Sequence, residues 1–174
     1  MRKIKGLAIV LVGLIWSLQA CTYKLSLNGA SIPPNMKTIR VEFFENTAPL
    51  VVNNLSQTFT EALKDRIRNT TRLSVVNGEA DAVMSGTITD FNIGPVSVQA
   101  TNNTTAPIAD QSRLTITVSV KYVYDADKKL SFEQTFSKFK DFKGDEGSQE
   151  QALIQDINKQ LTEDIFNRAF ANWD

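Results

Sequence analysis

The chain of 174 residues lacks histidine and has a single cysteine, and these two shortages exclude most enzyme and metal-site chemistry. Histidine is the commonest general base and the commonest metal ligand among side chains. One cysteine permits neither an intramolecular disulfide nor a Cys-x-x-Cys site. Positive charge is not in surplus, since 19 Lys and Arg balance 19 Asp and Glu, and this argues against a nucleic-acid partner. With 42% hydrophobic residues, the composition favours a folded protein that binds something over an enzyme.

The motifs that usually mark an active site are also missing. The sequence has no Gly-x-Gly-x-x-Gly, P-loop, Gly-x-Ser-x-Gly or His-Glu-x-x-His pattern. Ser137 and Lys140 have the spacing of a serine–lysine pair, but an odd spacing in a strand sends two side chains to opposite faces of a sheet. The acids at 125, 127, 141, 145 and 146 belong to turns and match no EF-hand loop. We expect no catalytic residue, no metal and no cofactor; a carboxylate-dependent hydrolase would need paired acids in a cleft.

The first 20 residues have the pattern of a secretory signal peptide. Three basic residues precede an apolar run from Gly6 to Trp16, which is too short to span a bilayer. Residues 18–21, Leu-Gln-Ala-Cys, resemble a bacterial lipobox. The resemblance implies cleavage before Cys21, a diacylglycerol on its sulfur and an acylated new amine, so that several acyl chains anchor the protein. Thr22 follows where an acidic residue would signal retention in the inner membrane. The alternatives are an ordinary signal peptide with a free thiol, or an uncleaved anchor.

Cleavage changes the charge of the mature chain. The removed segment holds three of the 19 basic residues and no acidic residue, so the mature chain has a net charge of −3. Residues 21–35 are mostly polar and end in Pro33 and Pro34, which cannot continue a helix, and we interpret them as lipid anchor and tether. No linker or repeat divides residues 36–174, so we expect them to form a single domain.

Hydrophobic periodicity predicts five strands and two helices in this domain. Alternation of apolar and polar residues, or short β-branched runs, predict strands over 37–44, 73–76, 82–93, 113–124 and 131–139. Helical spacing predicts one helix from Asn53 or Asn54, as N-cap, to about Asn69. A second helix follows a capping box of Ser148 and Gln151. The order β-α-β-β-β-β-α predicts an α+β fold in which two amphipathic helices pack on one face of a mostly antiparallel sheet of four to five strands.

Three local features of these elements need a structural test. In the first strand, Phe43 shares the apolar side with Ile39 and Val41, so we expect it to be buried. Gly86 lies within a predicted strand, where glycine marks a bulge or a close contact. The Asn/Thr/Ala-rich stretch Asn102–Ser112 is long for a connection in a compact domain, so it is either a binding loop or a merely mobile one.

Lysine is concentrated on the predicted hairpin of the last two strands and on its exit. Six of the 16 basic residues of the mature chain fall within 23 positions, interleaved with Phe132, Phe136, Phe139 and Phe142. One interpretation is an edge hairpin that lysine keeps soluble. The other is a site for an anionic amphiphile such as lipopolysaccharide, in which lysines meet phosphate and aromatic rings meet acyl chain or sugar. The candidate binding residues are Lys121, Lys128, Lys129, Lys138, Lys140 and Lys143.

Ordered segments of the mature chain resemble a known family. They are GASIPP from residue 29, KTIRVEFFENTAPLV from 37, LSQTFTEALKDRI from 55, TRLSVV from 71, ADAVMSGTITDFNIGPVSVQ from 80, RLTITVSVKYVYD from 113, FEQTFSKFKDF from 132 and LTEDIFNRAFANW from 161. After a lipobox, this ordered set resembles the LptE family of lipopolysaccharide-assembly lipoproteins, in the form found in Bacteroidetes. The resemblance covers nearly the whole mature chain, except for the Asn102–Ser112 stretch.

The resemblance implies a non-enzymatic lipoprotein that plugs the lumen of a large outer-membrane β-barrel, LptD. LptE-like proteins help that barrel to assemble and to place lipopolysaccharide in the outer leaflet, and they have a sheet covered by two helices. The implied partners are an LptD-type barrel, lipopolysaccharide, and the outer membrane through lipidated Cys21. The alternative is a periplasm-facing lipoprotein that binds an anionic amphiphile through the lysine-rich hairpin without a barrel partner.

Overall fold

One mixed sheet and two helices account for most of the residues that the computed structural model describes, which are 32–50, 52–96, 111–145 and 147–171. The strands are β1 (Thr38–Val41), β2 (Glu45–Asn46), β3 (Ser74–Val75), β4 (Ala82–Pro95), β5 (Ser112–Tyr124) and β6 (Phe132–Phe142). The helices are α2 (Leu55–Thr70) and α3 (Glu150–Phe170), and a 3-10 turn, η1 (Lys128–Leu130), joins β5 to β6. The predicted α+β class and element order are confirmed, with the two-residue β2 as an addition.

The sheet combines an antiparallel half with a short parallel half. The spatial order is β3-β1-β4-β5-β6, and β2 pairs with β4. The long strands β4, β5 and β6 form antiparallel ladders, as predicted. The short strand β1, in contrast, runs parallel to both β3 and β4, because α2 returns the chain to the end of the sheet at which β1 began. The mostly antiparallel character therefore belongs to the three long strands.

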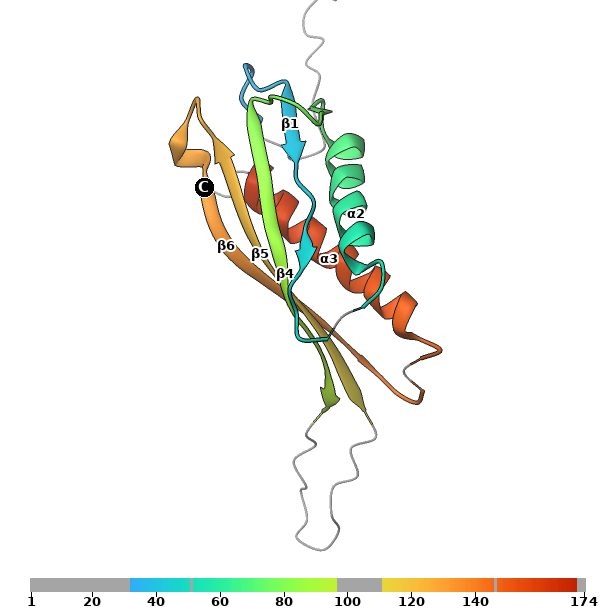
Figure 1. The fold of residues 1–174 in the computed structure, drawn as a ribbon. Coiled ribbons are helices and arrows are strands. Elements are labelled where there is room, and N and C mark those ends of the chain that lie inside the picture. Colours follow the sequence, from blue (N-terminus) through green and yellow to red (C-terminus); the bar gives the residue numbers. More distant parts are fainter. Residues whose placement is uncertain (1–31, 51, 97–110, 146, 172–174) are drawn as a thin grey trace, which may run out of the picture.

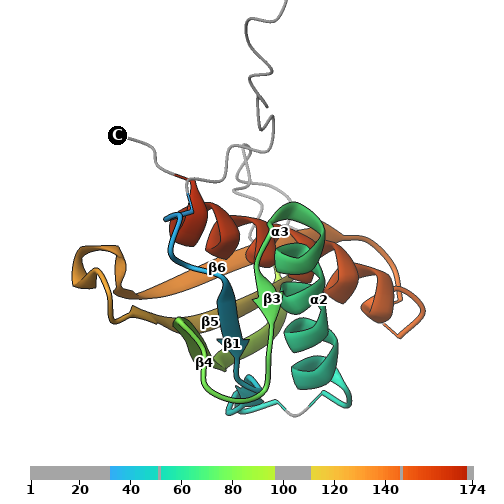
Figure 2. The same ribbon diagram turned by 90° about the horizontal axis from the view of Figure 1, so that it is seen from above.

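Both helices lie on the same face of the sheet (Figure 1). Seen from above, α3 lies over β5 and β6, and α2 lies beside β3 (Figure 2). The strand β5 shows the consequence most plainly, because every second side chain from Leu114 to Tyr124 is buried beneath the helices. The helices contribute the other half of this core. Their buried side chains include Leu55, Phe59, Leu63 and Ile67 from α2, and Leu153, Ile154, Ile157, Leu161, Ile165, Phe166 and Phe170 from α3.

The prediction for Phe43 is wrong by one residue. Phe43 is 58% exposed and Phe44 is completely buried. The strand β1 ends at Val41, so the alternation of the strand does not continue to residue 43. The ring of Phe44 packs against Phe59 at a centroid distance of 5.2 Å, and it passes over Gly86.

A Cβ on Gly86 would lie 2.5 Å from Phe44 Cε1 and would collide with the carbonyl oxygen of Ser119. Gly86 is thus the close contact that the sequence predicted, and the register shift of β4 lies farther along, between Ile88 and Asp90.

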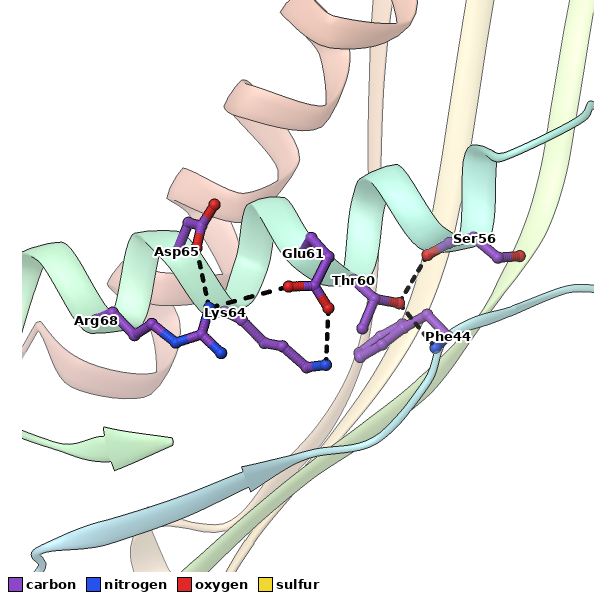
Figure 3. A network of polar contacts seen from close by, with 7 residues as sticks. All are labelled: Phe44, Ser56, Thr60, Glu61, Lys64, Asp65 and Arg68. Carbon is purple, nitrogen blue, oxygen red and sulfur yellow. Dashed lines mark hydrogen bonds and ion pairs between the residues drawn. The ribbon is translucent and has the colours of Figure 1, made fainter. Parts of the chain in front are cut away.

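A hydrogen-bonded threonine holds the chain after β1 to helix α2 (Figure 3). The buried Thr60 hydroxyl accepts a hydrogen bond from the Phe44 N–H at 3.1 Å and donates one to the Ser56 carbonyl at 2.7 Å. On the exposed side of α2, Glu61 pairs with Lys64 at 2.9 Å. Arg68 pairs with Asp65 and lies 3.9 Å from Glu61 (Figure 3). Exposed pairs of this kind stabilise little, so the buried threonine and the apolar core residues of α2 are what hold this helix against the sheet.

The helix starts differ from the predicted capping. Asn54 precedes α2 as predicted, but it has a φ of 63° and its side chain makes no capping hydrogen bond; its carbonyl accepts from the N–H and the hydroxyl of Thr58. The capping box at Ser148 is wrong, because α3 begins only at Glu150. The Ser148 N–H and hydroxyl donate to Asp145 instead, so this serine closes the preceding turn.

Some predictions fall outside the described residues. These are the signal peptide, Cys21 with most of the tether, and nearly all of the Asn102–Ser112 stretch, of which only the last two residues are described. Within the described ranges, no helix is long and apolar enough to cross a membrane.

Candidate functional site

The structure distributes the six candidate lysines over different surfaces. Lys138 and Lys140 are on the side of β6 that faces the helices. They lie between the buried Phe136 and Phe142 at every second position, and such positions share one side of a strand. Lys121 of β5 points to the opposite side of the sheet. Lys128 and Lys129 belong to η1, at the far end of the β5–β6 hairpin, and Lys143 follows the end of β6. The lysines that cluster in the sequence therefore do not form one patch.

Lys138 and Lys140 are paired with carboxylates of helix α3. Lys138 Nζ lies 2.7 Å from Asp164 Oδ2, and Lys140 Nζ lies 3.1 Å from Asp156 Oδ2. These acids are on α3, which covers β6, so the pairs join the edge of the sheet to the helix. Sequence reasoning missed the pairs because the acids and the lysines are far apart along the chain. Of the candidate lysines, Lys121, Lys128 and Lys129 make no ion pair with the described part of the chain.

The face of the sheet away from the helices is rich in hydroxyl groups. In each long strand, the residues that alternate with the core positions point to this face. The Thr117 and Ser137 hydroxyls are 3.0 Å apart across β5 and β6. Ser137 thus lies on this face while Lys140 lies on the other, which confirms that the two form no serine–lysine pair. We call this surface the open sheet face; its hydroxyl residues are Ser85, Thr87, Thr115, Thr117, Ser119, Thr135 and Ser137.

Near one end of the open sheet face, Arg113 is held by two neighbours on β6. Its Nε and Nη2 donate to the two carboxylate oxygens of Asp141 at 2.6 and 2.9 Å. Its guanidinium carbon lies 3.7 Å from the centroid of the Phe139 ring, which is 51% exposed. The hydrogen bonds from Arg113 lower the pKa of the Asp141 carboxyl and raise that of the guanidinium. The result is a pre-organised cation and aromatic ring on the surface, the combination enriched at binding hot spots.

Two further titratable groups have shifted pKa values whose causes the structure shows. The Asp81 carboxylate accepts hydrogen bonds from the N–H groups of Lys37 and Thr38 and from the Thr38 hydroxyl, and these bonds lower its pKa. Burial raises the pKa of Tyr122, whose hydroxyl points to Met36 Sδ at 3.6 Å. In the described ranges, no three His, Cys, Asp or Glu side chains come together as a metal site would require.

A groove between α2 and α3, lined by polar and apolar side chains, has no counterpart in the sequence predictions. It consists of two hollows of about 380 and 240 Å³, which share Thr58 and Gln155 in their walls. At the second hollow lies Asn158, which is buried but makes no hydrogen bond with its side chain. The sequence predicted that this helix is amphipathic, but a polar residue beside its apolar residues gives no signal of burial. The groove is a second candidate site, in addition to the open sheet face.

Comparison with known proteins relates the chain to lipoproteins. A model of the LptE family, described as lipopolysaccharide-assembly, matches residues 36–169. The solution structure of an uncharacterized lipoprotein B from Nitrosomonas europaea is similar with a TM-score of 0.56 and 16% identity, over 84% of this chain and 88% of that chain. The crystal structure of rare lipoprotein B from Shewanella oneidensis is similar with a TM-score of 0.53 and 12% identity, over 75% of this chain and 92% of that chain. No curated protein sequence matches the chain. At such low identity, the structural likeness concerns the fold alone.

Proposed function

The chain belongs to the LptE family of lipopolysaccharide-assembly proteins, and from this premise we propose that it is a non-enzymatic lipoprotein of the outer membrane. It fills the lumen of an LptD-type β-barrel, helps that barrel to assemble, and assists insertion of lipopolysaccharide into the outer leaflet. The observation that carries the proposal is the family match over residues 36–169, which spans both helices almost completely and every strand of the sheet.

The surface chemistry of the domain supports a place inside a barrel. The interior of an outer-membrane barrel is polar, because lipid-facing and lumen-facing residues alternate along its strands. A plug therefore needs a polar outer surface rather than an apolar one. The open sheet face, with its hydroxyl groups, meets this requirement, and the exposed side of α2 carries ion pairs rather than apolar residues. Interfaces of this kind are wet and depend on many hydrogen bonds.

The proposal includes a lipid anchor at Cys21, after removal of residues 1–20. The described domain supports a short tether, since Met36 is already in the core and the Arg72 guanidinium donates to the carbonyls of Ile32 and Pro33. Several acyl chains, of which palmitate is one, then hold the domain at the membrane. The variant Cys21→Ser is expected to lose incorporation of labelled palmitate. It is also expected to be found outside the membrane fraction.

Affinity purification from gently solubilised outer membranes tests the partnership. The lipidated protein, tagged at its C-terminus, is expected to co-purify with one large barrel protein that mass spectrometry identifies. Cys21→Ser is the control, because it leaves the sequence of the folded domain, residues 36–174, unchanged and removes the sulfur to which the lipid would be attached. Recovery of the lipoprotein alone from a preparation in which the barrel is present would contradict the proposal.

A second candidate function is direct binding of an anionic amphiphile such as lipopolysaccharide by the lysine-rich hairpin. The observation that favours it is the absence of ion pairs at Lys121, Lys128 and Lys129 within the described residues. Replacement of these three lysines by glutamine is expected to weaken binding of purified lipopolysaccharide. The same replacement at Lys138 and Lys140 is the control, since Asp164 and Asp156 already neutralise them. Equal binding by both variants and the unaltered protein would leave only the solubility interpretation.

A further inference from the structure

The groove between α2 and α3 is long enough to hold a chain-like ligand. The two helices lie side by side with their N-terminal ends toward the same end of the molecule (Figure 1). The larger hollow lies at the first turns of both helices, and the smaller one continues along them as far as Asn69. From Asn54 to Asn69 the groove extends over about 22 Å, at the rise of an α-helix. An extended polypeptide of six or seven residues has about the same length.

The walls of the groove combine neutral polar side chains with charged and apolar ones. Carboxamides and hydroxyls outnumber charged side chains, and no residue that lines either hollow is aromatic. Among the described lining residues a saccharide would find no ring to stack on, and an acyl chain would leave the carboxamides and hydroxyls of the walls without partners. A polypeptide main chain, which presents neutral donors and acceptors at each residue, matches such walls. The carboxamide and hydroxyl residues are Asn53, Asn54, Thr58, Asn69, Gln151, Gln155, Asn158 and Thr162.

Asn158 provides the independent sign of a ligand. The residue is 2% exposed, and neither its Nδ2 nor its Oδ1 has a hydrogen-bond partner among the described residues. Nearly all buried polar side-chain atoms in proteins do have one. The same hollow is lined by Arg66, whose Nε is also buried without a partner although its Nη2 pairs with Glu163 at 3.1 Å. Two donors and one acceptor thus lie unused at one place between the helices.

We propose that this groove binds an extended segment of the barrel's own polypeptide through its main-chain groups, an inference that rests on the proposed function. A carboxamide offers a donor and an acceptor in one plane, so Asn158 can bond the C=O and the N–H of the bound segment. Arg66 Nε donates to a further carbonyl. Because the Asn158 amide lies below the surface, flexible neighbours such as Gln155 and Lys159 shift when the segment enters.

Site-specific photo-crosslinking in native outer membranes tests the inference. A photoreactive amino acid replaces Thr58 or Gln155, which are exposed and line both hollows. Control proteins carry it at Thr115 or Thr135 on the open sheet face. The groove positions are expected to react with one short stretch of the barrel protein, mapped by mass spectrometry. If only the control positions label the barrel, the inference fails while the proposed function stands. If no barrel is present in the purified material, the proposed function itself fails. Labelling of lipopolysaccharide or phospholipid from the groove would also overturn the inference.

The substitution Asn158→Leu separates a binding role from a structural one. Leucine has a similar size and removes the two unpaired polar atoms of Asn158, so the unfolding midpoint is expected to stay constant or rise. Crosslinking from Thr58 is expected to fall about tenfold, the scale of one or two lost hydrogen bonds. Asn77→Leu, on an exposed residue between β3 and β4 that belongs neither to the groove nor to the open sheet face, is the matched control. Unchanged crosslinking in Asn158→Leu would overturn the proposed contact. If this variant does not fold, the crosslinks from Thr58 and Gln155 in the chain that keeps Asn158 test the inference by themselves.

Discussion

The two faces of strand β5 carry opposite kinds of side chains. On one face, every second residue from Leu114 to Tyr124 is buried under α2 and α3. On the other face, the alternating residues are mainly hydroxyl-bearing or charged, and neither α2 nor α3, the two described helices, covers them. The same backbone serves both faces, so the difference comes from side chains alone. One face holds the fold together, which leaves the other face free to meet a partner.

Adjacent residues on β5 provide the largest expected contrast. Ile116 is completely buried and Thr117 is its neighbour on the open sheet face. Ile116→Ala removes buried apolar atoms and leaves a cavity, so the free energy of unfolding is expected to fall by about 2–5 kcal/mol. Thr117→Ala is expected to change it by about 0.5 kcal/mol or less. Urea denaturation of the two variants measures both values, and equal losses would contradict the division of β5 into a structural face and a free face.

A glycine on the covered face tests how closely that face is packed. Gly86→Ala would place a Cβ against Phe44 and the carbonyl oxygen of Ser119. The chain must shift to admit it, and the free energy of unfolding is expected to fall by about 1–3 kcal/mol. Gly78→Ala is the matched control, because nothing lies within 4 Å of a Cβ at that position. If the two variants are equally stable, the residues around Gly86 are packed less closely than the structure shows.

At the junction of β1 and β4, a carboxylate provides a smaller effect that depends on pH. Hydrogen bonds from Lys37 and Thr38 lower the pKa of Asp81 in the folded protein below its ordinary value of 3.8. The charged form is therefore favoured by folding, and its contribution is present above pH 3.8 and is lost as pH falls through the lower, folded pKa. Asp81→Asn is expected to lose less stability than the unaltered protein when urea midpoints at pH 5 and pH 2.5 are compared. Asp125→Asn, in an exposed turn, is the control, and the same acid response in all three proteins would contradict the assignment.

Local patterns in the sequence predicted the long elements, and tertiary contacts decided what the sequence left open. The alternation from Arg113 to Tyr124 predicted β5 to within one residue, and helical spacing placed α2 within one or two residues. The parallel pairing of β1 depends on how α2 returns the chain, which no local pattern records. The burial of Phe44 in place of Phe43 depends on the space above Gly86.

The candidate site was predicted less well for the same reason. Lysine spacing on the last hairpin indicated one patch, but the pairs with Asp156 and Asp164 bring in a helix that is distant in sequence. The unpaired amide of Asn158 could not be found from spacing, because only the packing of α2 against α3 buries it.

The smallest expected effect concerns the edge of the covered face, where Lys138 meets Asp164 at 2.7 Å. Both side chains are partly exposed, so the pair is expected to contribute about 0.2–1 kcal/mol, and less at high salt. A double-mutant cycle with Lys138→Met and Asp164→Leu, measured by urea denaturation at low and high salt, gives this coupling directly. A coupling near zero at both salt concentrations would mean that Asp164 does not hold Lys138. Lys138 would then be available to an anionic ligand. It would no longer differ in this respect from Lys121, Lys128 and Lys129, which make no ion pair with the described part of the chain.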